Sequence, residues 1–296
     1  MERDKRGFIE LFAATFLFSL FGVFTRLIAN NLGVFFQLLL RVGLMSFIFF
    51  LIGYFTKVYK KINKKDLPLF LFRGLLIVVD FSCFYIAVNN LPLGLALFIF
   101  YAANVVISFM FGALFLKEKL NFVKIVSLLT AMLGLFVMYQ ESFGGVKLLP
   151  SIAALVSGCC FGLNNSTSKK LTDKYNSTLV NLIAYGASFV LVIPLIFLFK
   201  EQIPMNFSLL TAVELLGFSI VGVAAFYLTL NGFKYIEAQK ASLIMLTELL
   251  FVVLVGFLFF SEIPTKNTII GGLFIIIALA IPNINFKLPI HYNNLI

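Results

Sequence analysis

The feature that most constrains this chain is a series of apolar stretches, each about as long as a membrane is thick. A helix needs roughly 20 mostly apolar residues to cross the ~30 Å hydrocarbon core of a bilayer. The stretches are apolar on all sides rather than at every second position, which favours helices over a membrane β-barrel. We predict ten transmembrane helices, at Phe8–Ile28, Val34–Phe55, Leu67–Val88, Leu93–Leu116, Phe122–Tyr139, Leu149–Thr167, Thr178–Phe199, Phe207–Leu230, Ala238–Phe260 and Thr268–Pro282.

The composition excludes the ordinary soluble classes of protein. Of the 296 residues, 61% are hydrophobic and 12% are charged, and the mean hydropathy is +1.05. Soluble domains have about 45–50% apolar and about 25% charged residues. The chain is therefore neither an ordinary soluble enzyme nor a nucleic-acid-binding module.

The basic residues predict the orientation. With ten helices both termini lie on one side, which holds 17 of the 23 lysines and arginines; three lie on the other side and three within spans. Because cytoplasmic loops collect Lys and Arg, we expect a plasma-membrane protein with cytoplasmic termini. The net charge of +10 then faces anionic lipid head groups and needs no nucleic-acid partner. The basic run 57–65 is interpreted as a topology determinant, with a lipid-binding switch as the alternative.

The three cysteines, Cys83, Cys159 and Cys160, all fall within predicted spans. An odd number at membrane depth provides neither a disulfide framework nor metal-ligand spacing, so we expect no metal and no cofactor. Gly158 and Gly162 flank the last two cysteines with the spacing of a helix-contact motif. These small residues are expected to allow close helix packing, with a redox role as the alternative.

The two halves of the chain share an ordered set of residues, which indicates an internal repeat. Offsets of 142 and 144 residues align Phe84, Tyr85, Asn89, Gly112, Leu114, Phe115 and Glu118 with Phe226, Tyr227, Asn231, Gly256, Leu258, Phe259 and Glu262. Each half contains five predicted helices, and because five is odd, the second copy enters the membrane from the opposite side. Inverted-topology repeats of this kind are typical of secondary transporters. We predict one repeat at 1–143, a second at 144–285 and a polar tail at 286–296.

These residues resemble the ten-helix, EamA-like branch of the drug/metabolite transporter superfamily. The resemblance rests on Phe84-Tyr85-x-Ala87 before a helix ending at Lys117-Glu118-Lys119, repeated as Phe226-Tyr227 before a helix ending at Ser261-Glu262. It extends from Phe8 to about Pro282 and departs from the family at Thr229, where the second copy often has alanine. The resemblance implies a central cavity lined by helices 1, 3, 4, 6, 8 and 9, and alternating access without ATP. The chain has no phosphate-cradling Gly-x-x-x-x-Gly-Lys-Ser/Thr motif.

Polar residues at membrane depth predict the site. An ionisable side chain at the bilayer centre costs about 2.5–3.5 kcal/mol on insertion scales, so each one needs a partner or a function. Glu248 lies about 15 Å into its span and Asn104 about 16 Å into its own, near the midplane. The 144-residue offset makes the two positions equivalent. We expect both to bind substrate and Glu248 to carry a proton, with a structural hydrogen bond as the alternative for Glu248.

Further residues in the spans complete the predicted site. Asp80 is a second candidate for substrate binding and proton coupling. Arg41 and Arg73 are candidates for substrate binding, with structural ion pairs or snorkelling as the alternative. Aromatic and amide side chains are also expected to contact substrate, with packing or helix capping as the alternatives: Tyr85, Tyr101, Tyr227, Asn164 and Asn165. Glu118 and Glu262 end their helices and are interpreted as fixing loop geometry.

Together these features predict a secondary transporter that moves a small metabolite by alternating access, with proton coupling through Glu248. The mixed charge fits an amino acid or related zwitterion, and the tyrosines and asparagines fit aromatic or nucleoside-like metabolites. A passive facilitator or exchanger and a non-transporting membrane scaffold are the alternatives. An embedded enzyme is disfavoured, because the chain lacks a His-Glu-x-x-His motif and its one histidine, His291, lies in the tail. The expected partners are the substrate and the lipid bilayer.

Overall fold

The computed structural model describes residues 2–21, 23–24, 32–201 and 208–283. Within these ranges every regular element is a helix and no strand occurs. In chain order the elements are α1 (Glu2–Ser19), α3 (Val34–Thr56), α4 (Leu67–Asn90), α5 (Leu93–Phe115), α6 (Phe122–Tyr139), η1 (Gln140–Gly145), α7 (Leu148–Thr172), α8 (Ser177–Leu198), α9 (Leu209–Tyr235), α10 (Ala238–Met245), α11 (Thr247–Phe260), α12 (Lys266–Ala280) and η2 (Ile281–Asn283). The all-helical prediction is confirmed for this part of the chain. The predicted tail 286–296, with His291, lies outside the described residues.

Eight helical segments of the described chain are long and apolar enough to cross a bilayer, when η1 is counted with α6 and α11 with α10. Their bounds lie within a few residues of the predicted spans. Helix α12 is apolar but only 15 residues long. The predicted first span, Phe8–Ile28, continues past α1 into residues that the structure does not describe. The number of ten membrane-crossing helices therefore stays a prediction.

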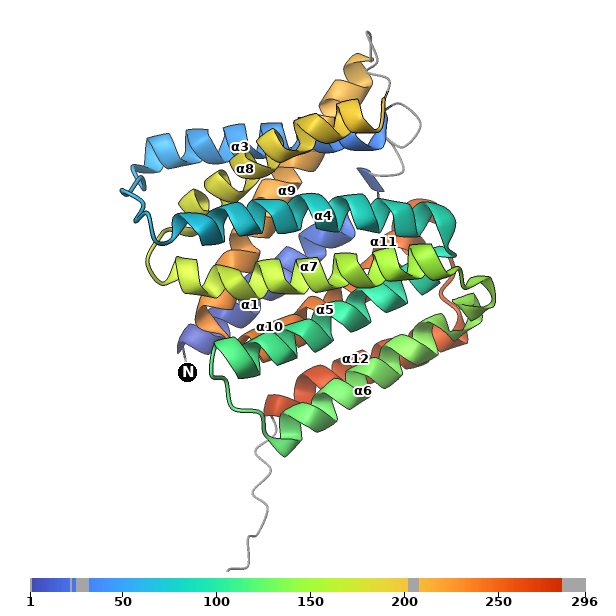
Figure 1. Cartoon of the computed structure of the whole chain (residues 1–296). Helices are drawn as coiled ribbons and strands as arrows, with labels where there is room; N and C mark the ends of the chain where they lie inside the picture. The colour runs from blue at the N-terminus through green and yellow to red at the C-terminus, as the bar shows by residue number, and fades with distance from the viewer. Residues whose placement is uncertain (1, 22, 25–31, 202–207, 284–296) are drawn as a thin grey trace, which may run out of the picture.

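The helices pack in a pattern with approximate twofold symmetry (Figure 1). Helix α3 packs against α8 at one edge of the bundle, and α6 packs against α12 at the other. Between these edges α4 and α5 contact α7, while α9, α10 and α11 contact α1. Helix α4 also contacts α8, and α9 contacts α3. In the two halves α1, α3, α4, α5 and α6 correspond to α7, α8, α9, α10–α11 and α12. Under this exchange the contacts α3–α8 and α6–α12 are unchanged, and each of the other contacts becomes another contact of the same set.

The backbone repeats the same turns in both halves. Four non-glycine residues of the described chain have a positive φ, and they are Lys57, Lys117, Lys200 and Ser261, with φ of 53°, 57°, 48° and 55°. Lys57 and Lys200 follow the equivalent helices α3 and α8, and the other two follow α5 and α11. Because residues with a side chain rarely adopt this conformation, its occurrence after two pairs of equivalent helices shows that both halves form the same turns.

Contacts between loops define a basic end of the bundle, made of loops 57–66, 116–121, 173–176 and 236–237. There Lys174 Nζ donates to Asp66 Oδ1 at 2.7 Å, and Lys169 Nζ donates to Glu118 Oε1 at 3.2 Å. This end holds most of the loop lysines. It is the side on which the sequence places the termini, and α1 begins there, beside the end of α9.

The opposite end is made of loops 91–92, 140–147, 199–201 and 261–265. Asn267 Nδ2 donates to Glu141 Oε1 at 2.6 Å, and the backbone N–H of Phe35 donates to Glu201 Oε2 at 2.8 Å. Equivalent turns of the two halves lie at different ends, because the turn after α5 is at the basic end and the turn after α11 is at the opposite end.

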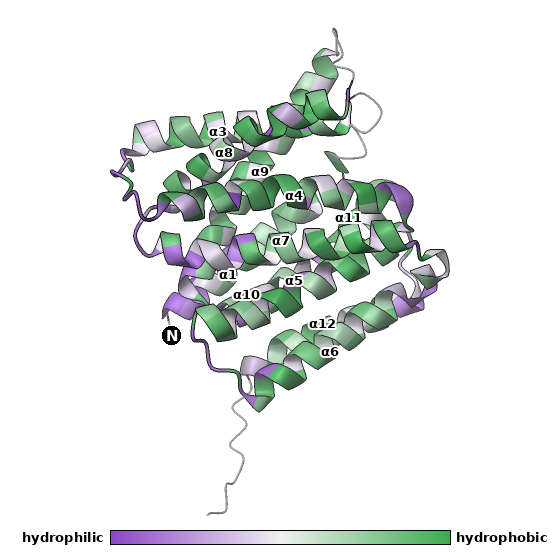
Figure 2. Ribbon diagram, viewed as in Figure 1, coloured by the Kyte–Doolittle hydropathy of each residue, from purple (hydrophilic) through white to green (hydrophobic). Residues whose placement is uncertain are grey.

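The outer surface of the bundle is apolar, whereas its interior contains polar side chains. Phe47 is 57% exposed and Leu114 is 70% exposed, and many other large apolar side chains are exposed along the helices. Figure 2 shows hydrophobic residues along the helices and hydrophilic residues concentrated in the loops. Acyl chains of a bilayer would cover such a surface, which in water would promote aggregation. The polar residues that could act on a substrate therefore lie inside.

Candidate functional site

Most of the predicted site residues are buried in the bundle. Relative exposure is 9% or less for seven of them, namely Arg41, Arg73, Asp80, Tyr101, Asn104, Asn164 and Asn165. Glu248 and Tyr227 are partly buried. Tyr85 is 39% exposed on α4 and is not brought together with the others.

Glu248 lies where a predicted helix is broken. The predicted span Ala238–Phe260 is present with the same bounds, and within it a single turn residue, Leu246, separates α10 from α11. The Tyr101 side chain of α5 lies close enough to the Glu248 carboxylate for the two groups to interact electrostatically. Tyr139, at the end of α6, lies within electrostatic range of the same group and was not predicted. Discontinuous helices line the substrate sites of many secondary transporters.

A pair of buried hydroxyl groups connects this break to α1. Thr247, beside Glu248, shares a hydrogen bond of 2.9 Å with Thr15, and the two residues are 2% and 0% exposed. Thr247 Oγ1 also donates to the carbonyl oxygen of Ile244 at 2.7 Å. The first half of the chain therefore contacts the broken helix of the second half through both α1 and α5.

Asn104 packs against α7 rather than against Glu248. No hydrogen bond joins the two side chains in the described chain, and Asn104 Nδ2 has no partner there. A Cβ on Gly162 would lie 2.7 Å from the Asn104 carbonyl oxygen, and one on Gly158 would lie 2.9 Å from the Ala103 side chain. The two glycines thus allow the close helix contact that their spacing predicts.

Helix α4 presents its two charged residues to α7. Ser157 Oγ donates to Asp80 Oδ1 at 2.6 Å, and Arg73 Nε donates to the carbonyl oxygen of Asn164 at 3.3 Å. Asp80 and Arg73 share one face of α4, as their spacing predicts. Each is bound by α7 and not by the other.

Arg41 of α3 is surrounded by aromatic rings. Its guanidinium carbon lies 3.8 Å from the centre of the Phe218 ring, 4.8 Å from that of Phe81 and 5.6 Å from that of Phe21. Ring faces attract a desolvated cation by about 2 kcal/mol. The rings supply no strong acceptor, however, and Arg41 Nε has no hydrogen-bond partner among the described residues.

Two residues of α8, Tyr185 and Asn181, belong to this region and were missed in the sequence. Both are 1% exposed, and neither Tyr185 Oη nor Asn181 Nδ2 has a hydrogen-bond partner where the chain is described. Tyr185 lies within electrostatic range of Arg41, Arg73 and Asp80. A signal was present, since Tyr185 is the one tyrosine of α8 and Asn181 lies one turn before it.

The asparagine pair of α7 adds further buried polar atoms. Asn164 Oδ1 and both polar side-chain atoms of Asn165 have no hydrogen-bond partner in the described ranges. A buried polar group without a partner costs about 1–3 kcal/mol. A cluster of such groups is therefore a place where a polar ligand would be stabilised.

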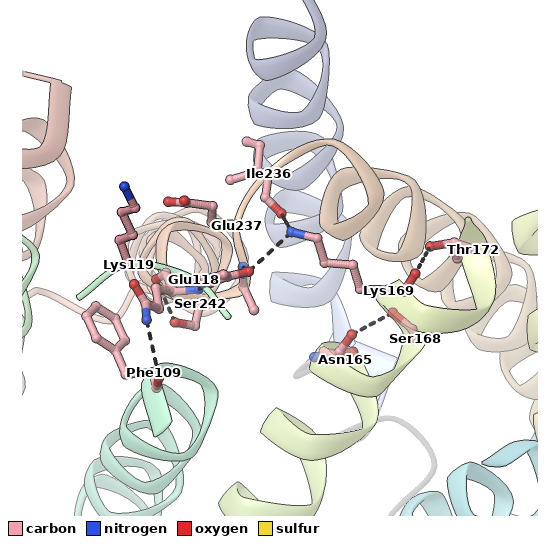
Figure 3. Close-up of polar contacts among 12 residues, drawn as sticks. Phe109, Glu118, Lys119, Asn165, Ser168, Lys169, Thr172, Ile236, Glu237 and Ser242 are labelled. Atoms are coloured by element: carbon pink, nitrogen blue, oxygen red, sulfur yellow. Dashed lines mark hydrogen bonds and ion pairs between the residues drawn. The ribbon is translucent and has the colours of Figure 1, made fainter. Parts of the chain in front are cut away.

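At the basic end, Glu118 joins the two halves of the chain (Figure 3). Its side chain is 5% exposed. Oε1 accepts from the backbone N–H of Ala238 at 2.7 Å and from Lys169 Nζ at 3.2 Å, while Oε2 accepts from the N–H of Gln239 at 3.2 Å. Lys169 Nζ also donates to the Ile236 carbonyl oxygen at 2.8 Å. The carboxylate thus caps α10 and connects it to the loop after α5 and to α7.

Lys124 extends this network. Its Nζ donates to Gln239 Oε1 at 2.7 Å and to the Lys119 carbonyl oxygen at 2.6 Å, and it forms an ion pair of 2.9 Å with Glu237. Gln239 Nε2 in turn donates to the Phe109 carbonyl oxygen at 3.4 Å. The loop 236–237 between α9 and α10 is therefore held from α6, α7 and the loop after α5 together.

Two surface hollows lie away from the predicted site. One is lined by the first turns of α1, and another by Tyr54, Phe55, Lys57 and Tyr59. In the described ranges no three His, Cys, Asp or Glu side chains gather as metal ligands would. The chemistry of the interior is that of hydrogen bonds and charges.

Comparison with known proteins agrees with this architecture. The sequence profile of the EamA-like transporter family matches twice, over residues 5–140 and 148–284. An "uncharacterized transporter" of Clostridium kluyveri is 27% identical over 225 residues, covering 73% of this chain and 72% of that protein. Another of Archaeoglobus fulgidus is 25% identical over 199 residues, covering 66% and 68%. A solved crystal structure has a similar fold, with a TM-score of 0.78 and 16% identity over 93% of this chain and 96% of that chain.

The two profile matches follow one another in the order of the two sequence repeats. The family and the names of the relatives indicate a multi-pass membrane transporter rather than an enzyme, with a lipid bilayer as its surroundings and a small molecule as its substrate. The resemblance inferred from Phe84-Tyr85 and Glu118 is thereby confirmed. The chain belongs to the EamA-like transporter family.

Proposed function

We propose that this protein is a secondary transporter whose ten helices form two inverted repeats, 1–143 and 144–285, that expose one central site alternately to the two sides of the membrane. The observation that carries the proposal is the break between α10 and α11. There Glu248 of the second half meets Tyr101 of the first half in the interior. The twofold pattern of helix contacts supports alternating access, because each contact that opens one end has an equivalent at the other.

The chemistry of the buried residues favours a zwitterion such as an amino acid. Glu248 would accept hydrogen bonds from the ammonium group, with the Tyr101 hydroxyl as its neighbour. The same carboxyl group can carry a proton instead, so that proton and substrate compete for one group and their fluxes are coupled. Asp80, bonded to Ser157, is the second candidate for proton coupling. Asn104, Asn164 and Asn165 would supply neutral contacts.

The Glu118 network would be the contact that closes the basic end. It connects the loop after α5, the end of α7 and the beginning of α10. For the central site to reach that end, Glu118 must release Lys169 and the backbone of α10. We place the basic end in the cytoplasm, because cytoplasmic loops are enriched in lysine.

The experiment is uptake by purified protein in liposomes, with a mixture of labelled amino acids and an imposed pH gradient. We expect uptake by the wild type to depend on pH, and Glu248→Gln to lose that dependence together with most of the uptake. Glu262→Gln is the matched control, because it removes a glutamate just after the same helix, at an exposed position.

Each outcome has a separate meaning. Unchanged uptake with unchanged pH dependence in Glu248→Gln would remove Glu248 from the mechanism. Uptake that equilibrates without responding to the gradient identifies a passive facilitator or exchanger. Absence of flux for amino acids, nucleosides and other labelled metabolites contradicts transport itself.

A further inference from the structure

Three buried hydrogen-bond donors on α3, α4 and α8 have no acceptor. They are Arg41 Nε, Arg73 Nη1 and Tyr185 Oη, and none has a hydrogen-bond partner within the described residues. The three residues are 9%, 1% and 1% exposed. Buried donors are normally satisfied, since leaving one without an acceptor costs about 1–3 kcal/mol. The missing acceptors therefore point to a ligand.

Packing between α4 and α8 places Tyr185 beside Arg73. Ser188, one turn after Tyr185, donates its hydroxyl to the carbonyl oxygen of Gly74 at 3.0 Å. Gly74 directly follows Arg73, and a Cβ on it would lie 3.1 Å from the carbonyl oxygen of Ala184. The two helices therefore touch at the level of both donors.

Arg41 reaches the same region from α3. Its guanidinium carbon lies 4.8 Å from the ring centre of Phe81, which follows Asp80 on α4. The Tyr185 hydroxyl lies within electrostatic range of Arg41, Arg73 and Asp80. Along their helices, Arg73 is about 9 Å and Tyr185 about 12 Å from the basic end, and Arg41 is about 10 Å from the opposite end. Arg73 and Tyr185 thus lie at similar depths, while Arg41 lies nearer the opposite end.

Around Tyr185 the charged groups of the described chain include more cations than anions. Among the charged groups that the structure places around Tyr185, two are guanidinium groups and one is a carboxylate, Asp80, whose Oδ1 already accepts from Ser157. A surplus cation at membrane depth is costly. An anionic ligand would offset the charge and also supply the missing acceptors, through charge-assisted hydrogen bonds.

We propose that Arg73 and Tyr185 form a subsite for the anionic group of the substrate, a carboxylate or a phosphate, and that the charge of Arg41 attracts this group from the α3 side. This inference rests on the proposed transport function and narrows its substrate class to molecules with an anionic oxygen group. Asn181 Nδ2, one turn before Tyr185 and also without an acceptor in the described chain, extends the subsite along α8. Glu248 then receives the cationic group when the substrate is a zwitterion.

The test is a thermal-shift panel on the full chain in lipid nanodiscs, because ligands that bind the folded state raise its melting temperature. The panel contains amino acids, their carboxamides, sugar phosphates, nucleosides, inorganic phosphate and chloride. We expect stabilisation by compounds that carry a carboxylate or a phosphate. It should disappear when an amino acid is replaced by its carboxamide, which keeps the ammonium group and nearly the same size. The amino-acid and sugar-phosphate arms distinguish the two sources of anionic oxygen.

Variants assign the binding to the three residues. Arg73→Gln should weaken binding of the best compound about tenfold, because it removes a charge-assisted contact, and Arg41→Gln should weaken it less, because it removes a charge at longer range. Tyr185→Phe removes a hydroxyl that has no partner within the described chain, so the fold should be kept while binding weakens about three- to tenfold. Arg6→Gln is the control for charge alone, since its side chain is 61% exposed, and it should leave binding unchanged.

Stabilisation by neutral or cationic compounds alone overturns the subsite and leaves the transporter proposal standing. An anionic compound that binds Tyr185→Phe and Arg73→Gln as tightly as the wild type also overturns it. So does a panel in which no anionic compound binds a protein that shows uptake in liposomes. Absence of both binding and uptake contradicts the proposed function itself.

Discussion

The same helix end is built twice in this protein, once at each end of the bundle. After α5 the N–H of Glu118 donates to the carbonyl oxygen of Gly112 at 2.9 Å, and after α11 the N–H of Glu262 donates to that of Gly256 at 3.1 Å. In both turns the residue before the glutamate has a positive φ. The backbone of the two turns is therefore equivalent.

The two glutamate side chains differ. The Glu118 side chain is 5% exposed and accepts hydrogen bonds from α7 and α10, whereas Glu262 is exposed at the end of α11. Local sequence thus determines the turn, and contacts between distant segments determine what the carboxylate does. The comparison indicates that the basic end is tied across the two halves by a buried carboxylate, whereas the equivalent glutamate at the opposite end is exposed.

The largest expected effect comes from removing the Glu118 and Glu262 carboxylates in turn, which tests whether the buried one stabilises the fold more than the exposed one. Glu118→Ala leaves the first N–H groups of α10 uncapped and takes one acceptor from Lys169, which is 21% exposed. Removing one partner of a buried ion pair costs about 3–5 kcal/mol, and the partial exposure of Lys169 lowers our expectation to about 3 kcal/mol. Glu262→Ala should cost less than about 1 kcal/mol, because exposed ion pairs contribute little. The free energy of unfolding in mixed micelles measures both.

A second pair of variants separates charge from capping. Glu118→Gln keeps an oxygen acceptor for α10 but loses the attraction to Lys169, so it should destabilise less than Glu118→Ala. Equal losses for Glu118→Ala and Glu262→Ala would show that burial of the first carboxylate has no energetic consequence, and would remove the difference between the two ends.

Adding a methyl group beneath each carboxylate should give effects of opposite sign. A Cβ on Gly112 would lie 2.6 Å from Glu118 Oε2 and 3.0 Å from Gln239 Cγ, and this carboxylate is held by its partners. We expect Gly112→Ala to cost about 1–2 kcal/mol through overpacking. A Cβ on Gly256 would lie 2.8 Å from Glu262 Oε2, which is the end of a flexible and exposed side chain.

Gly256→Ala should therefore stabilise α11 by about 0.5–1 kcal/mol, the usual gain from replacing a helical glycine. Melting temperatures of the two variants in the same detergent provide the measurement. A loss of similar size in both would mean that Glu262 is held as firmly as Glu118.

The sequence predicts most of the helices because the cost of placing a segment in lipid depends on that segment alone. Helices α3 and α5 begin at the predicted residues. The break at Leu246 could not be found in this way, because neither a proline nor a glycine marks it in the sequence. The structure shows the break beside contacts from Thr15 and Tyr101, which belong to the other half of the chain.

The site is less predictable than the fold for the same reason. Depth along a helix identified Glu248, Arg73 and Asp80 as candidates for substrate binding. It does not indicate which side chains contact one another. The repeat offset pairs Glu248 with Asn104, whereas the structure places Tyr101 next to it. Tyr185 is the one tyrosine of its span, but its place beside Arg73 became visible only with the contacts of α8 with α4.

Helices α6 and α12, which follow the turns at Glu118 and Glu262, should have N-caps of equal strength. Their caps therefore serve as a control for the comparison of the two ends. Asn121 Oδ1 accepts from the N–H of Lys124 at 2.9 Å, and Thr265 Oγ1 accepts from the N–H of Thr268 at 3.2 Å, at equivalent positions before α6 and α12. Asn121→Ala and Thr265→Ala should each cost about 1 kcal/mol, a typical value for a helix N-cap. Unfolding in mixed micelles checks this. A large excess at Asn121 would indicate that local caps, too, depend on the end of the molecule.

The smallest expected effect is a pH dependence confined to the basic end. Asp66 accepts from Lys174 Nζ at 2.7 Å and from Tyr175 Oη at 2.9 Å, and these hydrogen bonds, that of Lys174 first, lower the pKa of Asp66. A lowered pKa stabilises the fold above the ordinary aspartate pKa, and this stabilisation is lost as the pH falls through the folded-state pKa.

Ser208, the equivalent residue before α9 at the opposite end, accepts from the N–H of Thr211 and does not titrate. The melting temperature of the wild type should therefore fall slightly more between neutral pH and about pH 3 than that of Asp66→Asn, while Ser208→Ala keeps the wild-type pH dependence. If Asp66→Asn falls as far as the wild type, the acid sensitivity arises elsewhere and the two ends do not differ in this respect.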